Sequence, residues 1–236
     1  MKKHLKRLAA PRSWPLPRKT NVWVVRPSPG PHPHNLAMPL AVIVRDLLRH
    51  CDTGREAKRI IGSRNIWVDG RPVSNHKHPV GIMDVISIPD MKEHYRFLLD
   101  SRGHFTPVKL TDKDAKWKMV RIENKSKVKG GLIQLNLHDG RNILLKKNAY
   151  KTGDTLKISL PEQKILGHYP LAKGNSAVLL AGKHAGKLVH VDDYTPTRNP
   201  KENVVTFQEG FATVKDNVFI VGKKSPEIKL PEVPAI

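Results

Sequence analysis

The sequence predicts an α+β protein of several small modules behind an extended N-terminal arm. Prolines recur through residues 1–37, where they exclude long helices and central strands. Apolar residues then recur at helical spacing to about residue 62, and beyond residue 92 they alternate with polar residues, as in strands. The 236 residues suffice for one large core or two to three small ones. We place the modules at residues 1–37, 38–91, 92–170 and 171–236.

The arm, residues 1–37, has eight Lys or Arg and no Asp or Glu. It also holds two tryptophans, which purely solvated tails rarely carry because they cannot bury an indole ring. We therefore expect a segment that orders on RNA, with its cations along phosphates and its rings stacking or wedging. The alternative is a flexible solubilising tail. The residues expected at the contact are Lys2, Lys3, Lys6, Arg7, Arg12, Trp14, Arg18, Lys19, Trp23 and Arg26.

Residues 38–91 are expected to begin with two short helices. The first starts at Pro39, a residue suited to a first helical turn, and runs to about Arg49. The second has Thr53 as its N-cap and Glu56 three residues later, which together predict a capping box. Strands follow at 66–68, 71–73 and 84–88, the first two joined by a tight turn at Asp69-Gly70.

Residues 92–170 carry seventeen Lys or Arg against eight Asp or Glu. A hairpin is predicted from 132–137 and 142–145 around Asp139-Gly140, with a further strand at 155–160. Five lysines of this β-rich module are expected to contact phosphates: Lys125, Lys127, Lys129, Lys146 and Lys147. The alternative is that these lysines protect exposed strand edges from pairing with other chains.

Residues 177–191 read as strand, glycine-rich basic turn and strand, which resembles a KOW motif. The resemblance implies a small SH3-like β-barrel in residues 171–236, completed by strands at 204–207, 211–214 and 217–221. Its loop tip would present Lys183, His184 and Lys187 to RNA, and its glycines would let the backbone approach closely. Ala181 and Val189 replace glycines that are usual in the motif, so the loop geometry is expected to differ.

The composition restricts the class of partner and cofactor. A net charge of +21 and a pI near 10.2 point to a polyanion, with nucleic acid ahead of a membrane surface. No apolar run is long enough for a transmembrane span, and no signal-peptide core precedes the first prolines. The single Cys51 excludes an intramolecular disulfide framework, and the pairs His32/His34 and His76/His78 lack further ligands nearby. We therefore expect neither a metal nor another cofactor.

The first module resembles the alpha-L RNA-binding motif, which has two short helices, a basic face on the second, and then a strand with a V-D-G-R turn. This motif occurs in the small-subunit ribosomal protein four fold, some pseudouridine synthases and some tRNA synthetases. The resemblance implies phosphate contacts from Arg55, Lys58, Arg59 and Arg64, with rim contacts from Arg45, Arg49 and Arg71. The alternative is that these are solvated helix charges, paired in part with Asp52 and Glu56.

A longer resemblance extends through the chain. Residues 4–11, Trp14 and residues 26–32 are similar to the arm of the archaeal and eukaryotic e-type small-subunit ribosomal protein four family. Residues 167–175 and 218–222 are similar to stretches that follow in the same order. The absence of a long eukaryotic-style C-terminal extension favours the archaeal version.

The resemblance implies a structural, non-enzymatic constituent of the small ribosomal subunit in the cytoplasm. It would help to fold and hold ribosomal RNA during assembly and translation, beside neighbouring small-subunit proteins, without forming homo-oligomers. One alternative is a KOW-type translation or transcription factor that binds transiently. Another is an RNA-modifying enzyme that uses the alpha-L module as its reader, although Asp69 is explained by its turn and no catalytic domain is evident.

Overall fold

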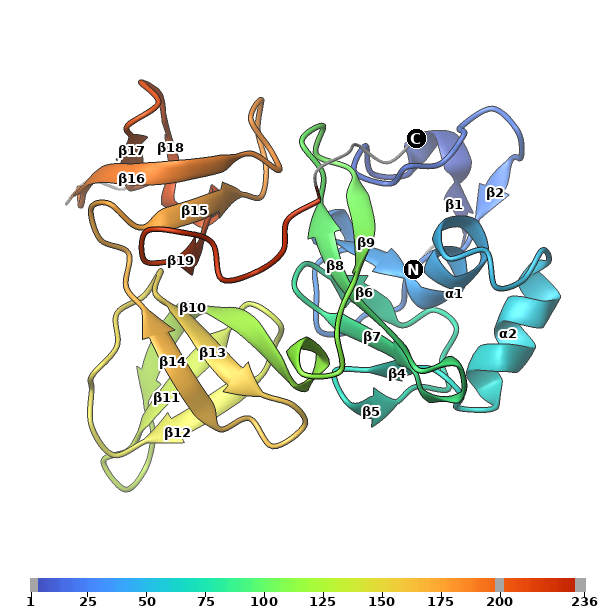
Figure 1. Ribbon diagram of the computed structural model, residues 1–236, viewed down its shortest axis with the longest axis horizontal. Helices are drawn as coiled ribbons and strands as arrows, with labels where there is room; N and C mark the ends of the chain where they lie inside the picture. Colours follow the sequence, from blue (N-terminus) through green and yellow to red (C-terminus); the bar gives the residue numbers. More distant parts are fainter. Residues whose placement is uncertain (1–3, 198–201, 232–236) are drawn as a thin grey trace.

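The structure is a computed structural model that describes residues 4–197 and 202–231 (Figure 1). The described residues form three five-stranded sheets, two two-stranded ribbons and few helices, so the protein is a multi-module α+β chain. The arm, the helices and the first sheet occupy one half of the molecule, and the central and C-terminal sheets occupy the other (Figure 1).

The arm is folded onto the first module. Its short elements are β1 (Leu5–Lys6), η1 (Arg7–Ala9), β2 (Trp23–Val24), η2 (His34–Leu36) and β3 (Ala37–Pro39). β1 pairs with β2, and β3 pairs with β6 (Pro79–Gly81) of the first module. The side chain of Trp14 is only 2% exposed, and its Nε1–H donates to the carbonyl of Ala37 at 2.9 Å. The arm is therefore anchored on the first module through a few buried side chains, whereas others, such as Trp23 at 56%, stay exposed. The expectation that the arm orders on RNA stays a prediction.

Two helical segments follow, as the apolar spacing predicts. The first is α1 (Leu40–Val42), which continues as the π-helical turn η3 (Ile43–Leu47) and ends sooner than predicted, since Arg49 has a left-handed φ of 56°. The second is α2 (Gly54–Gly62), and the predicted capping box is confirmed. The side-chain oxygen of Thr53 accepts from the backbone N–H of Glu56 at 3.2 Å, and the Glu56 carboxylate accepts from that of Thr53.

The first sheet has the strand order β5-β4-β7-β8-β9. Its strands are β4 (Trp67–Val68), β5 (Arg71–Pro72), β7 (Val85–Ile88), β8 (Glu93–Leu99) and β9 (Phe105–Lys109). The predicted tight turn joins β4 to β5, with positive φ of 52° at Asp69 and 73° at Gly70. The sheet extends past residue 91, where the sequence suggested a module boundary, because β8 pairs with β7 from Val85↔Arg96 to Ile88↔Glu93.

The central sheet has the order β12-β11-β10-β13-β14. After η4 (Pro89–Met91) and η5 (Asp114–Lys116), its strands are β10 (Trp117–Lys127), β11 (Ile133–Leu137), β12 (Asn142–Leu145), β13 (Thr155–Ser159) and β14 (Ile165–Tyr169). The first half of β10, residues 118–122, is buried on both faces: Val120 packs into the core of this sheet and Met119 into that of the first module. The predicted hairpin and the further strand correspond to β11, β12 and β13.

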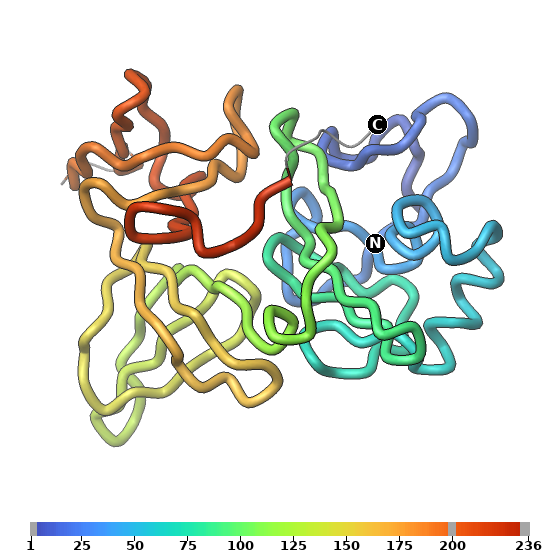
Figure 2. The backbone as a smooth tube through the Cα atoms, viewed as in Figure 1, coloured from blue at the N-terminus to red at the C-terminus, as the bar shows by residue number. Residues whose placement is uncertain are grey.

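The C-terminal sheet has the order β18-β17-β16-β15-β19. Its strands are β15 (Ser176–Leu179), β16 (Leu188–Thr195), β17 (Val204–Phe207), β18 (Ala212–Val214) and, after η6 (Lys215–Asn217), β19 (Val218–Gly222). Beyond β19 the chain crosses back to the first half of the molecule (Figure 2). There Ile228 joins the main core, which also contains Trp14 of the arm and Phe219 of β19. The main core therefore connects all the modules.

Candidate nucleic-acid interface

Helix α2 presents the densest of the predicted cationic surfaces. Ala57 and Ile61 are buried against the module, whereas Arg55, Lys58 and Arg59 are exposed. Arg64 is also exposed and has a left-handed φ of 62° just beyond the helix. These four side chains, together with the exposed Arg49 and Arg71, form no ion pair with any residue that the structure describes.

The acidic neighbours of α2 do not neutralise this face. Glu56 Oε2 accepts the backbone N–H groups of Thr53 at 3.2 Å and of Asp52 at 3.1 Å, and these donors lower the pKa of the Glu56 carboxyl. Asp46 pairs with Arg45 at 2.8 Å, which makes Arg45 the one predicted cation of this module whose charge is satisfied internally within the described chain. The carboxylate of Glu56 is thus committed to its own helix end, and the α2 cations remain available to a partner.

The arm residues divide into anchors and exposed side chains. Arg7 is buried and donates from Nε to the carbonyl of Pro17, while Arg18 binds the carbonyls of Leu8, Ala10 and Pro11. Trp14 is equally buried, so the stacking or wedging expected of its ring is wrong: the indole packs inside the protein. The side chains left open to solvent are Lys6, Arg12, Lys19 and Trp23, of which Trp23 is 56% exposed. Lys2 and Lys3 lie outside the described residues.

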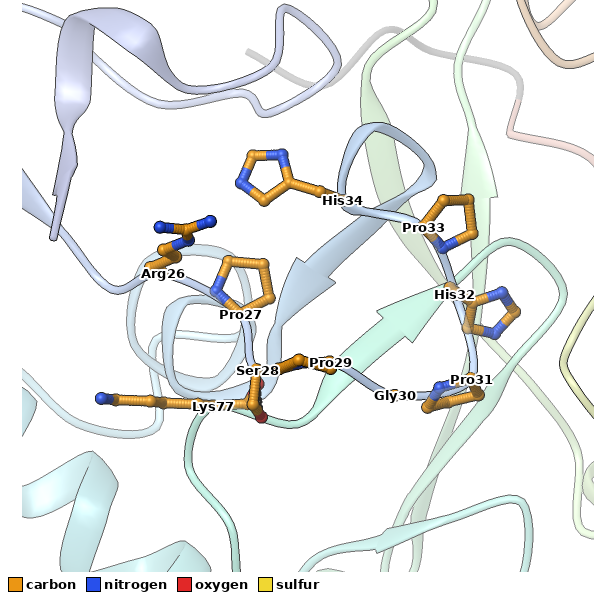
Figure 3. A pocket seen from close by; sticks show the side chains of 10 residues that line it. All are labelled: Arg26, Pro27, Ser28, Pro29, Gly30, Pro31, His32, Pro33, His34 and Lys77. Atoms are coloured by element: carbon orange, nitrogen blue, oxygen red, sulfur yellow. Dashed lines mark hydrogen bonds between the residues drawn. The ribbon is translucent and has the colours of Figure 1, made fainter. Parts of the chain in front are cut away.

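A pocket of about 720 Å³ opens where the arm crosses β6 (Figure 3). Proline rings of residues 27–33 form its walls, and Arg26, His34 and Lys77 stand at its rim. Burial and the nearby Arg26 lower the pKa of His34, which favours a neutral imidazole. Lys77 is exposed and was not among the predicted residues, although it lies in the basic His76-Lys77-His78 run. Trp67, 39% exposed on β4, was also missed because it was assigned only to a strand.

The central lysines are spread over the far end of the molecule. Lys127, Lys129, Lys146 and Lys147 are exposed around the β10–β11 loop and the end of β12, a strand at the sheet edge. Lys125 differs, because its Nζ donates to Asn148 Oδ1 at 2.8 Å and to the carbonyl of Tyr150 at 2.5 Å. Figure 1 places α2 at one end of the molecule and the β10–β11 loop at the other, so the predicted residues do not form one patch.

The loop between β15 and β16 packs partly against protein. Lys183 and Lys187 are exposed, but the His184 ring packs on Phe211 with 4.4 Å between ring centroids. A Cβ on Gly186, where φ is +80°, would collide with the carbonyl of Asp100 in the β8–β9 loop. Glycine is therefore needed at this position because two loops of the chain approach each other there. The reason expected from the sequence was a close approach of RNA to the backbone.

A buried ionic cluster joins the arm, the first sheet and the central sheet. Lys118 Nζ lies 2.6 Å from Asp69, 3.1 Å from Asp84 and 2.5 Å from Asp139. Arg141 also binds Asp69 at 2.8 Å, and His32 binds Asp84 at 2.9 Å. Burial opposes charge on Lys118, but the three carboxylates more than offset it and raise the pKa of Lys118 above its usual range. The cluster could not be recognised from the sequence, because its members lie in the arm, in separate turns and in β10, far apart along the chain.

Neither a metal-ligating group nor a membrane-spanning helix is found in the described part of the chain. It contains no group of three or more His, Cys, Asp or Glu side chains placed to hold a metal ion. His32, one of the histidines considered as a ligand, is turned into the ionic cluster. Across residues 4–197 and 202–231, none of the helices has the length and apolar character needed to cross a bilayer.

Comparison with known proteins gives consistent matches along the chain. Residues 91–165 match the ribosomal family S4e, and residues 1–35 match the RS4NT (NUC023) domain. Small ribosomal subunit protein eS4 of Methanocaldococcus jannaschii is 47% identical over 97% of this chain and 98% of its own. The corresponding protein of Methanothermobacter thermautotrophicus is 43% identical over 98% and 96%. The crystal structure of 30S ribosomal protein S4e from Thermoplasma acidophilum superposes with a TM-score of 0.70 at 36% identity, covering 80% of this chain and 96% of that one.

Proposed function

The chain belongs to the ribosomal S4e family, in its archaeal version, and we propose how its surface serves the small ribosomal subunit. We infer that it is a structural constituent of that subunit in the cytoplasm, because its relatives are small ribosomal subunit proteins eS4. We infer that it contacts ribosomal RNA and neighbouring subunit proteins, and that it acts without catalysis. Its modules neutralise phosphates on RNA segments and hold these segments in fixed relative positions.

The unpaired cationic face of α2 carries this proposal. Arg55, Lys58 and Arg59 are exposed on α2, and the Glu56 carboxylate is bound at the N-terminal cap of the helix. The three positive charges therefore repel one another unless an anion lies over them. RNA phosphates supply that anion at close spacing, and guanidinium groups suit them by bidentate geometry. The helix pair and the V-D-G-R turn at Asp69 support assignment of this region as an alpha-L module.

The C-terminal sheet is proposed to be the KOW-type, SH3-like barrel. Five short strands in the order β18-β17-β16-β15-β19, with a basic glycine-containing loop between β15 and β16, support this assignment. Lys183 and Lys187 are the loop residues proposed to reach RNA, since His184 packs on Phe211. The four central lysines without internal partners, Lys127, Lys129, Lys146 and Lys147, are proposed as further phosphate contacts.

The enzyme alternative is not favoured. Asp69, the carboxylate that a pseudouridine synthase mechanism would need, is 5% exposed and bound by both Lys118 and Arg141. A carboxylate held this way is neither a free base nor a nucleophile. The transient-factor alternative predicts release from subunits in a high-salt wash, whereas a structural constituent stays bound.

The α2 proposal is tested by RNA binding at several salt concentrations. In a plot of log K against log salt, the slope is negative. The triple substitution Arg55→Gln, Lys58→Gln and Arg59→Gln is expected to make it less steep by about 2–3, because each lost phosphate contact contributes about 0.9. Lys164→Gln is the matched control, since this exposed lysine is already paired with Glu162 at 2.6 Å. An unchanged slope in the triple variant would contradict the role assigned to α2.

A further inference from the structure

The β8–β9 loop, residues 100–104, is held between two segments remote from it in sequence. On one side lies the β15–β16 loop, which contains Ala185 and Gly186. A Cβ on Gly103 would lie 3.1 Å from the Cβ of Ala185, and a Cβ on Gly186 would overlap the carbonyl of Asp100. On the other side the backbone N–H of Phe105 donates to the carbonyl of Ser13 in the arm at 2.8 Å. In Figure 1 this loop projects between the arm and the β15–β16 loop.

Each of the three segments carries cations close to this contact. Arg102 of the β8–β9 loop and Arg12 of the arm line a pocket of about 510 Å³, whose apolar walls come from residues 14–17. Lys183 and Lys187 flank the glycine that touches the β8–β9 loop. All four side chains are exposed, and none has a side-chain partner among residues 4–197 and 202–231. We call these four residues the junction.

Asp100, the acidic residue of the β8–β9 loop, does not neutralise the exposed cations of the junction. Asp100 is fully buried, and its Oδ1 accepts the backbone N–H groups of Arg102 at 2.9 Å and His104 at 2.7 Å. Its carboxylate thus shapes the loop from within, while the Arg102 side chain extends to the surface. The result is an outward-facing concentration of positive charge beside an apolar pocket.

We propose that the junction binds a strand of RNA, and that docking of the C-terminal sheet against the first sheet assembles this site. The inference rests on the proposed function and adds a location that no single module contains. Two guanidiniums beside an apolar pocket fit the alternation of phosphate and base along a nucleotide strand. Lys183 and Lys187 then contact phosphates further along the same strand. RNA bound there also holds the two sheets together, since it favours the docked arrangement.

Gly186 provides a test of assembly that leaves the charge unchanged. Gly186→Ala places a Cβ against the Asp100 carbonyl, so the loops separate. Gly182→Ala is the matched control, because Gly182 has a similar positive φ of +91° but no atom within 4 Å of the new Cβ. Both variants carry the cost of a left-handed alanine, and only Gly186→Ala also breaks the contact between the loops.

The experiment measures binding of an archaeal small-subunit rRNA transcript at several salt concentrations. Arg102→Gln and Lys183→Gln are each expected to weaken binding about fivefold at low salt and to lower the salt slope by about 1, in line with one lost phosphate contact. Lys113→Gln removes the same charge from an exposed lysine outside the junction and is expected to have less than a twofold effect. Thermal melts of the exposed-site variants verify that they remain folded.

The combined variants test whether the site depends on docking. Gly186→Ala should weaken binding more than Gly182→Ala, and Lys183→Gln should cost less than about twofold in the Gly186→Ala background, because the loop has already left the site. Equal effects of Arg102→Gln and Lys113→Gln would overturn the junction while leaving the proposed function intact. Wild-type protein that binds the transcript with no salt dependence would instead overturn the proposed function.

Discussion

Removal of the Lys118 ammonium tests whether the buried ionic cluster stabilises the fold. Lys118→Met keeps the length and apolar stem of the side chain but leaves Asp69, Asp84 and Asp139 without their shared counter-ion. Breaking a buried ion pair from one side costs about 3–5 kcal/mol. Arg141 still reaches Asp69 and Asp139, and His32 still reaches Asp84, so we expect the lower end, about 3 kcal/mol.

Urea unfolding and thermal melting measure this loss. For a chain of this size, about 3 kcal/mol corresponds to a fall in Tm of roughly 6–12 °C. The matched control is Lys164→Met, which breaks the exposed pair with Glu162, where the side chains are 74% and 62% exposed. This control should leave the unfolding midpoint nearly unchanged, because solvent screens an exposed pair. Adding Asp139→Asn to Lys118→Met should restore part of the stability, because one uncompensated carboxylate is removed. Equal costs for Lys118→Met and Lys164→Met would refute the reasoning.

The two arm tryptophans should behave in opposite ways. Trp14→Ala should cost about 3–5 kcal/mol and expose the arm to limited proteolysis, whereas Trp23→Ala should change stability by less than about 0.5 kcal/mol and weaken RNA binding; equal protease sensitivity would contradict this. Burial lowers the pKa of His138 to about 3, so the unfolded chain binds a proton below about pH 6.5 that the folded chain does not. The free energy of unfolding should therefore fall as the pH drops from 6.5 to about 5, and a His138→Asn variant, followed by urea unfolding at each pH, should show a shallower fall.

Local patterns were predictable because their causes lie within a few residues. Thr53 and Glu56 form the capping box expected from their spacing, and Asp69-Gly70 forms the expected tight turn between β4 and β5. Both features depend on backbone conformations that short side chains or glycine favour wherever they occur. The succession of an arm, helices and then strands followed from proline placement and apolar periodicity in the same way.

Features that depend on contacts between distant segments were not predictable. Nothing near Trp14 in the sequence indicates that the first module buries it, and Lys118 has ordinary neighbours although its partners are 49 and 34 residues away. The pairing of β8 with β7 likewise joins residues on both sides of the expected boundary at residue 91. Positive charge alone cannot separate Arg7, which is a buried anchor, from Arg12, which is exposed.

The ionic cluster also imposes an order of events during synthesis of the chain. Asp84 is synthesised 34 residues before Lys118. At 5–20 residues per second, this separation corresponds to a delay of roughly 2–7 s. During that interval the nascent N-terminal half contains two aspartates whose common counter-ion has not yet been made. That half can reach its final form only once β10 has been added. A chain interrupted before residue 118 would therefore lack the counter-ion that Asp69 and Asp84 share.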